Sequence, residues 1–400
     1  MAFDVSRIRA CYPALADGYV YLDGAAGTQT PAAVIGAISD AYLAGLSNAG
    51  GAFPASARAV AITAAVRQAV ADLTGGEPDG VVLGPNMTTL TYRIAAALAD
   101  TWRPGDEVIV SRLDHDANVR PWVQAASRAG AVVRWAEVDP ATGELPSAQY
   151  ADLLSDRTRL MAVSAASNVI GTRPDVPAIT AMARSAGALS YVDGVHATAH
   201  GPVDVGALGT DFYATSAYKW SGPHIGAVVA APALLASLRP DKLVPSPDSV
   251  PERFELGTPA FADFAGVTAA VDHLAALDGT ARGTRRERVL ISMAAAQRHE
   301  QELFRTLLGG LDSMRHVTTY GKAARRTATA YFTVAGLTPD RVAELLAARQ
   351  VNVWSGHNYA WELTGVLGIR DSGCAVRAGL VHYNDETDVT RLLDAVAELG

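Results

Sequence analysis

A lysine and an aspartate each follow a predicted buried strand in the segment Tyr191–Gly226. The apolar run 188–192 predicts a strand that ends at Asp193 and His196, and a second apolar run leads into Lys219. Ligands bind at the C-terminal ends of strands in open α/β sheets. A desolvated lysine has a lowered pKa and forms Schiff bases with carbonyl compounds. An acidic residue that reaches a pyridinium nitrogen completes the protein's part of pyridoxal phosphate chemistry.

Each of these residues also has a purely structural interpretation. Asp193 could cap a helix, and Lys219 could be a surface lysine whose stem covers apolar neighbours. The presence of Ser216 and His196 at the observed spacings favours the chemical interpretation over the structural one.

Three other polar stretches follow predicted strands. Residues 84–89 precede a predicted helix, where free N–H groups and threonine hydroxyls suit a phosphate. His115 could lie over an aromatic ring or simply cap its own loop. Asn168 ends another strand, where its amide could orient a ring oxygen or a carboxylate. The glycine-rich loop 23–28 is expected near the site, although a solvent-exposed linker would explain it nearly as well.

Apolar strands alternate with amphipathic helices from Val81 onward, which is typical of a mostly parallel sheet covered on both faces. Right-handed crossovers bring the ends of such strands to one edge of the sheet. The strands are expected near 81–83, 107–111, 132–138, 160–164, 189–192, 212–215 and 227–230. The helices between them are expected near 88–99, 119–129, 150–155 and 179–186.

A long helix over 285–311 is predicted to lead into a smaller α/β unit. Its expected elements are a strand over 327–334, a helix over 340–348, strands over 351–354 and 376–381, and a final helix over 386–399. We therefore predict an N-terminal segment 1–30 that packs with the small domain, a large cofactor-binding domain 31–280 and a small C-terminal domain 281–400.

The composition of the 400-residue chain narrows the function classes. A net charge of −8 argues against a nucleic-acid or anionic-membrane partner. No apolar run approaches the ~20 residues of a membrane span, and the N-terminus lacks the apolar core of a signal peptide. The two cysteines, Cys11 and Cys374, suit a reducing compartment, so we expect a cytoplasmic protein. No metal site is predicted.

The motifs, taken in order, resemble those of the class V aminotransferase branch of fold-type I pyridoxal-phosphate enzymes, and most of all its cysteine desulfurase-like group. The matching motifs are Asp193-Gly-Val-His196, Ser216-Ala-Tyr-Lys219, Gly257-Thr-Pro259 and Arg377 followed by Tyr383-Asn384. The resemblance covers nearly the whole chain. It implies an α/β fold with a mostly parallel central sheet in a large domain and a small C-terminal α/β domain.

The resemblance also implies a role at each matching position. Lys219 would hold pyridoxal 5'-phosphate covalently and move protons at the substrate α-carbon. Asp193 would pair with the pyridine nitrogen and His196 with the phenolic oxygen of the ring, while Val195 and His115 would lie on its two faces. The residues implied to hold the phosphate are Asn86, Met87, Thr88, Ser216 and Tyr218.

The same resemblance implies a substrate clamp and a second subunit. Arg377 would bind the substrate α-carboxylate with help from Asn168, although a structural ion pair is the alternative for an arginine in an apolar strand. Thr258 would reach the site from the partner subunit, so the implied active unit is a homodimer with a shared active site. The other residues expected at the amino-acid substrate are Ala26, His357 and Tyr359.

One stretch departs from the desulfurase pattern. In those enzymes a mobile loop before the arginine strand carries a cysteine that attacks the substrate sulfur, whereas this chain has Gly356-His357-Asn358-Tyr359 there. Cys374, three residues before Arg377, is expected to be a small packing residue. A persulfide mechanism is therefore poorly supported.

We expect an enzyme in which Lys219, His115 and Tyr359 act in catalysis. The favoured reaction is β-elimination from cysteine or an S-substituted cysteine, with Tyr359, His357 or Tyr218 as the group that protonates the leaving group. The alternatives are an aminotransferase, an epimerase, a desulfurase that uses another thiol, and a non-catalytic cofactor-binding protein. The aromatic side chains near the predicted loop, Trp354, Tyr359 and Trp361, could wall a substrate pocket or pack between domains.

Overall fold

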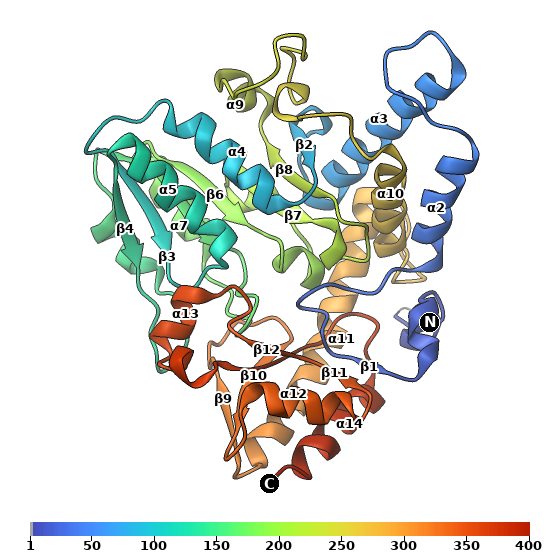
Figure 1. Cartoon of the computed structure of the whole chain (residues 1–400), viewed down its shortest axis with the longest axis vertical. Helices are drawn as coiled ribbons and strands as arrows, with labels where there is room; N and C mark the ends of the chain where they lie inside the picture. Colours follow the sequence, from blue (N-terminus) through green and yellow to red (C-terminus); the bar gives the residue numbers. More distant parts are fainter. Residues whose placement is uncertain (1–2) are drawn as a thin grey trace.

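The computed structural model describes residues 3–400, and its largest feature is a seven-stranded sheet between two layers of helices (Figure 1). Across the sheet, the strands are β2 (Val81–Gly84), β8 (Gly226–Ala230), β7 (Phe212–Ser216), β6 (Leu189–Asp193), β5 (Thr158–Ser164), β3 (Glu107–Ser111) and β4 (Val132–Ala136). Neighbours from β4 to β7 are parallel, and β8 is antiparallel to both of its neighbours. The prediction of a mostly parallel central sheet is confirmed.

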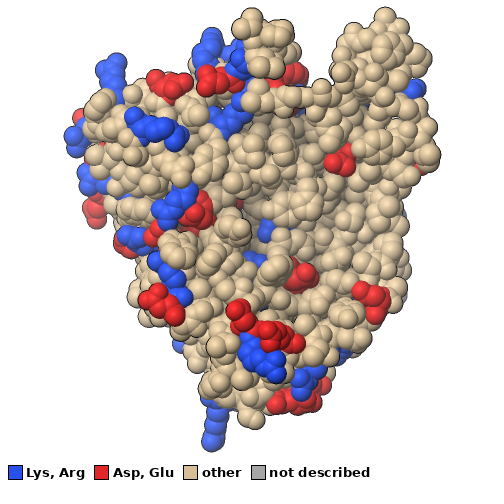
Figure 2. Space-filling model, in the orientation of Figure 1, with Lys and Arg blue, Asp and Glu red and all other residues tan. Residues whose placement is uncertain are grey.

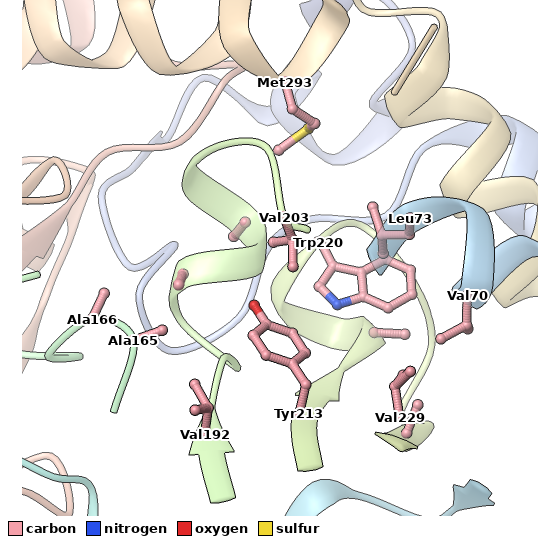
Figure 3. Close-up of a cluster of buried hydrophobic side chains, with 14 of the residues drawn as sticks. Val70, Leu73, Ala165, Ala166, Val192, Val203, Tyr213, Trp220, Val229 and Met293 are labelled. Atoms are coloured by element: carbon pink, nitrogen blue, oxygen red, sulfur yellow. The ribbon is translucent and has the colours of Figure 1, made fainter. Parts of the chain in front are cut away.

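Alternate side chains of the strands enter different cores because the sheet is covered on both faces. Val108 packs with the helices of one face, α4 (Met87–Ala99) and α5 (Arg120–Ala129). Its neighbour Ile109 packs into the core of the opposite face. The helices of that face are α3 (Pro54–Thr74), α7 (Val176–Ser185), α10 (Phe261–Ala275) and α11 (Arg285–Ser313). Figure 3 shows part of this second core, with Tyr213 and Trp220 on the sheet side and Met293 above them.

The C-terminal part forms a second, antiparallel sheet below the first (Figure 1). Its strands, in order, are β12 (Trp354–Gly356), β13 (Ala375–Gly379), β10 (Thr329–Val334) and β9 (Val317–Tyr320). The C-terminal half of α11 packs in one core with α12 (Pro339–Ala347) and α14 (Glu386–Ala397). The remaining helices are α1 (Val5–Arg9), α2 (Ala32–Leu43), α6 (Tyr150–Leu153), α8 (Val205–Leu208), α9 (Pro232–Ser237) and α13 (Trp361–Val366).

The prediction of one strand over 351–354 is wrong. The chain there serves two sheets: β11 (Val351–Asn352) pairs with β1 (Val20–Tyr21), and β12 then pairs with β13. Helix α10 and strand β9 were not predicted. Helix α10 is buried by α2, α3 and α11 and is apolar nearly all round, so it has no one-sided pattern that would mark it as a helix.

The N-terminal segment contacts both parts of the molecule. Strand β1 joins β11, and Arg9 forms an ion pair with Asp388 of α14 at 2.7 Å. Arg7, however, donates to the carbonyl oxygen atoms of Ala276 and Leu277, which follow α10. The domain boundaries at residues 30 and 280 stay predictions.

No helix within residues 3–400 is long and apolar enough to cross a membrane. Acidic and basic side chains are interspersed on the face shown in Figure 2, and some basic atoms lie in a hollow at its centre.

Candidate active site

The C-terminal ends of the parallel strands meet the N-terminus of α4 around an inner pocket of about 410 Å³. The pocket is lined by Met87, Thr88, His115, Ser164, Ala166, Asn168, Asp193, Val195, His196, Tyr218 and Lys219. An outer cleft of about 2040 Å³ shares part of this wall and includes Ala26, Asn86, Trp354, His357, Tyr359 and Arg377. The two sheets therefore build one continuous site.

Lys219 is placed by the tight turn that follows β7. Its Nζ atom donates a hydrogen bond to the carbonyl oxygen of Ala25 at 2.6 Å. Burial and the charge of Arg377 lower the pKa of Lys219 to about 7, and the charge of Asp193 opposes this shift. A large share of the amine is therefore neutral, and nucleophilic, near neutral pH.

Asp193 ends β6 and is buried beside the pocket. Its Oδ1 atom accepts the N–H of Val195 at 2.9 Å, which leaves Oδ2 for a ligand. Burial raises the pKa of Asp193 to about 6, and the positive charge of Lys219 lowers it. A cationic ring nitrogen in the pocket would hold this carboxylate in its ionised form.

Two histidines lie at the pocket in neutral form. Burial lowers the pKa of His196 well below its usual range, and its Nε2 atom lies 3.0 and 3.1 Å from the hydroxyl oxygen atoms of Thr327 and Thr329. Burial lowers the pKa of His115 to about 3, and its Nδ1 atom accepts an N–H from its own loop. The ring of His115 stacks on Tyr359, with 5.3 Å between ring centroids.

The N-terminus of α4 forms the part of the pocket predicted to take a phosphate. The Oδ1 atom of Asn86 caps the helix by accepting the N–H of Thr89 at 2.9 Å. The N–H of Met87 donates to the hydroxyl of Ser216 at 3.1 Å, so Ser216 joins the turn before Lys219 to this helix end. Backbone N–H groups and the helix dipole favour an anion here.

Arg377 lies on β13 and is 3% exposed. Its Nη1 atom donates to the carbonyl oxygen of Asn168 at 3.0 Å, and burial lowers its pKa to about 10. Within residues 3–400 no carboxylate pairs with it, and both its Nε atom and the Oδ1 atom of Asn168 lack a partner. Arg377 therefore forms no structural ion pair among the described residues, although the charge of Asp23 raises its pKa and partly offsets the effect of burial. The buried, unpartnered Nε–H of Arg377 suits a ligand with a carboxylate, whereas Oδ1 of Asn168 can only accept a hydrogen bond from a donor.

These groups fit pyridoxal 5'-phosphate: a reactive amine, a carboxylate with a free oxygen, and a capped helix N-terminus surround one pocket. When bound, this cofactor supplies a conjugated ring that stabilises negative charge on a substrate carbon.

Some expectations do not map onto the pocket of a single chain. Thr258 is exposed and lines neither the pocket nor the outer cleft, and Ser216 is buried and lines neither of them. Asp114 was not predicted as a site residue. It is a buried neighbour of His115, and burial raises its pKa to about 7. Its carboxyl group accepts hydrogen bonds from the side chains of Ser111 and Asn118. An acidic residue beside a predicted site histidine was the available signal.

We predict that Lys219 of the cofactor-free protein reacts with added pyridoxal 5'-phosphate at a rate that rises with pH. The midpoint of this rise is expected near pH 7, the pKa of Lys219, because only the neutral amine attacks. Arg377→Gln removes a positive charge and should move this midpoint to higher pH. Stopped-flow absorbance measures both profiles, with Lys219→Ala as the blank. A midpoint near 10.5, the ordinary lysine value, would contradict the assignment.

The family model, the related sequences and the related structures all indicate the same protein family. The family model for Aminotransferase class-V matches residues 20–392. An uncharacterized protein of Mycobacterium tuberculosis is 39% identical, with all of both chains covered. A probable cysteine desulfurase of Pseudomonas putida is 34% identical over 98% of each chain. The structure of a cysteine desulfurase from Escherichia coli superposes with a TM-score of 0.87 at 28% identity, covering 100% of this chain and 98% of the other. The chain thus belongs to the class V aminotransferase family and is a pyridoxal-phosphate-dependent enzyme of fold type I, similar to the cysteine desulfurases.

Proposed function

We propose that this enzyme is a C–S β-lyase that acts on cysteine or an S-substituted cysteine. The observation that carries the proposal is the position of the thiols. Tyr359 lines the substrate cleft, whereas neither Cys11 nor Cys374 lines the cleft or the inner pocket. Cys374 is 4% exposed, and burial raises the pKa of its thiol. A protein thiol that could accept sulfur is therefore missing from the site, while the groups for removing an α-proton are present.

The residues of the chain divide the work of such a reaction. Arg377 and Asn168 bind the substrate α-carboxylate and so fix the α-carbon beside the amine of Lys219. Lys219 takes the α-proton, and Asp193 keeps the cofactor ring nitrogen protonated. Breaking the Cβ–S bond leaves a thiolate, which needs a proton donor at the mouth of the pocket.

Tyr359 is our first choice for that donor because the loop around it is held in place. The N–H of Asp116 donates to the carbonyl oxygen of Tyr359 at 2.8 Å, and Asn168 donates to that of Asn358 at 2.8 Å. Directly after the loop, Glu362 of α13 forms ion pairs with Arg112, which follows β3, and with Arg120 of α5. The loop backbone is thus held in place, and the phenol ring stacks on His115 and lines the cleft.

The products formed from L-cysteine and from a panel of S-substituted cysteines test the proposal. We expect pyruvate and ammonia in equal amounts, because the aminoacrylate released by β-elimination hydrolyses to them. Cys374→Ser should leave the rate unchanged. Alanine as the product, lost in Cys374→Ser, would instead indicate a desulfurase. A keto acid that retains its sulfur, or the D-amino acid, would indicate transamination or epimerisation.

Tyr359→Phe should lower kcat about a hundredfold for an S-alkyl cysteine, since an alkyl thiolate needs a proton as it leaves. An S-nitrophenyl cysteine, whose thiolate is stable without a proton, should be affected much less. The phenyl ring keeps the stack on His115, so the pocket wall is retained. His357→Asn and Tyr218→Phe are the matched variants. If either of them shows this leaving-group dependence and Tyr359→Phe does not, that residue is the donor.

We also propose a homodimer, in the cytoplasm, with Thr258 contributed by the partner subunit. Large apolar side chains are exposed on α2 and on the segment before Thr258: Ile35, Tyr42, Leu43, Leu243, Val244 and Leu256. A protein interface over these two segments would bury these exposed apolar side chains. Two unpaired cysteines are compatible with a reducing compartment.

Mixing two inactive variants tests the shared site. Lys219→Ala removes the amine of its own site, and Thr258→Asp should repel the cofactor phosphate in the site of its partner. A heterodimer of the two has one site with both native residues. Random exchange of equal amounts should restore about one quarter of the wild-type activity. Mixtures that remain inactive, although size measurements show exchange, would contradict the shared site.

A further inference from the structure

A second cleft, of about 1270 Å³, lies behind the cofactor pocket. Successive residues face the two sites: Ala166 and His196 line the pocket, while Ala165 and Ala197 line this cleft. No residue is shared between the cleft and either part of the active site. The lining of this cleft includes the charged residues Arg173, Asp204 and Arg325 and the apolar residues Val176, Val203 and Leu208.

Two arginines of this cleft oppose each other across an antiparallel bridge. Thr172 pairs with Arg326, and the N–H of Arg173 donates to the carbonyl oxygen of Arg325 at 2.9 Å. Residues directly opposite in such a pair project their side chains to the same face, where like charges are destabilising. Burial lowers the pKa of Arg173, and the charge of Arg325 lowers it further.

Neither guanidinium has an ion-pair partner within residues 3–400, and no side-chain hydrogen bond involves Arg173 or Arg325. Tyr213 and, more weakly, Glu300 raise the pKa of Arg173 and so oppose the effect of Arg325. The carboxylate of Glu300 is buried against His200, whose Nδ1 atom lies 2.7 Å away. Asp204, the acidic residue of the lining, is paired with Arg286. Two facing positive charges in an otherwise acidic protein therefore lack a counter-charge.

We propose that this cleft binds a small organic oxyanion. Its carboxylate or phosphate lies between Arg173 and Arg325, which suit two-pronged contacts with such groups. Its apolar part packs against the buried side chains of Val176 and Val203 and against Leu208. The site is separate from the active site and does not depend on the reaction proposed above.

Isothermal titration of the holoenzyme with phenyl phosphate, benzoate and inorganic phosphate tests this site. Phenyl phosphate or benzoate should bind, and the stronger of the two identifies the preferred anion. Inorganic phosphate should bind at least tenfold more weakly than phenyl phosphate, because it lacks the apolar part. Arg173→Gln and Arg325→Gln should each weaken binding about tenfold or more. Arg128→Gln, which removes an exposed arginine of α5, should not change it.

Arg377 of the active site is the main alternative binding site for these anions. Binding that persists in Arg377→Gln and is lost in Arg325→Gln places the ligand in the cleft. Binding that is lost in Arg377→Gln and unchanged in both cleft variants would overturn the proposal, as would no binding of any probe to the wild-type holoenzyme. Circular dichroism and bound cofactor check the folding of each variant. Arg325 is exposed, so its replacement is not expected to disturb the core.

Discussion

The site depends on the burial of two basic groups, Lys219 and Arg377, which lie close enough for the charge of Arg377 to act on Lys219. Burial lowers the pKa of both groups, and Arg377 adds to the shift of Lys219. Cations are normally buried only with a counter-ion, because desolvation costs several kcal/mol per ion. Here the carboxylate of Asp193 is beside the lysine, and the guanidinium has a single backbone partner. Binding an amino acid with its carboxylate would complete this unfinished arrangement.

The two sheets therefore cannot be separated functionally. Lys219 and Asp193 come from the large sheet, whereas Arg377 comes from β13. Its contact with Asn168 and the contacts of His196 with Thr327 and Thr329 cross between the two parts. These strands pack into the two cores on the faces of the large sheet and into the separate core below it. Rigid supports are what allow a buried charge to stay where water cannot compensate it.

Sequence patterns within a few neighbouring residues predicted the features that depend on those residues alone. Lys219, Asp193 and His196 each follow an apolar strand, and the structure gathers all three at one pocket. Their chemical roles stay predictions. Features that arise from long-range packing escaped the sequence analysis: the division of 351–356 between two sheets, the burial of α10, and the pairing of Thr327 and Thr329 with His196. Arg173 and Arg325 of the second cleft lie more than a hundred residues apart in the sequence, so only the folded chain shows that they face each other.

The loop that bears Tyr359 has a consequence for the fate of the sulfur. Its backbone carbonyl groups accept hydrogen bonds from Asp116 and Asn168, and its side chains contain no thiol. A loop without a thiol cannot accept a sulfur atom covalently and carry it out of the pocket. In the proposed β-elimination, the sulfur that leaves the β-carbon of a cysteine would be set free as a diffusing molecule. The cell would receive its sulfur as dissolved sulfide or thiol, available to any acceptor, rather than by delivery to a chosen protein.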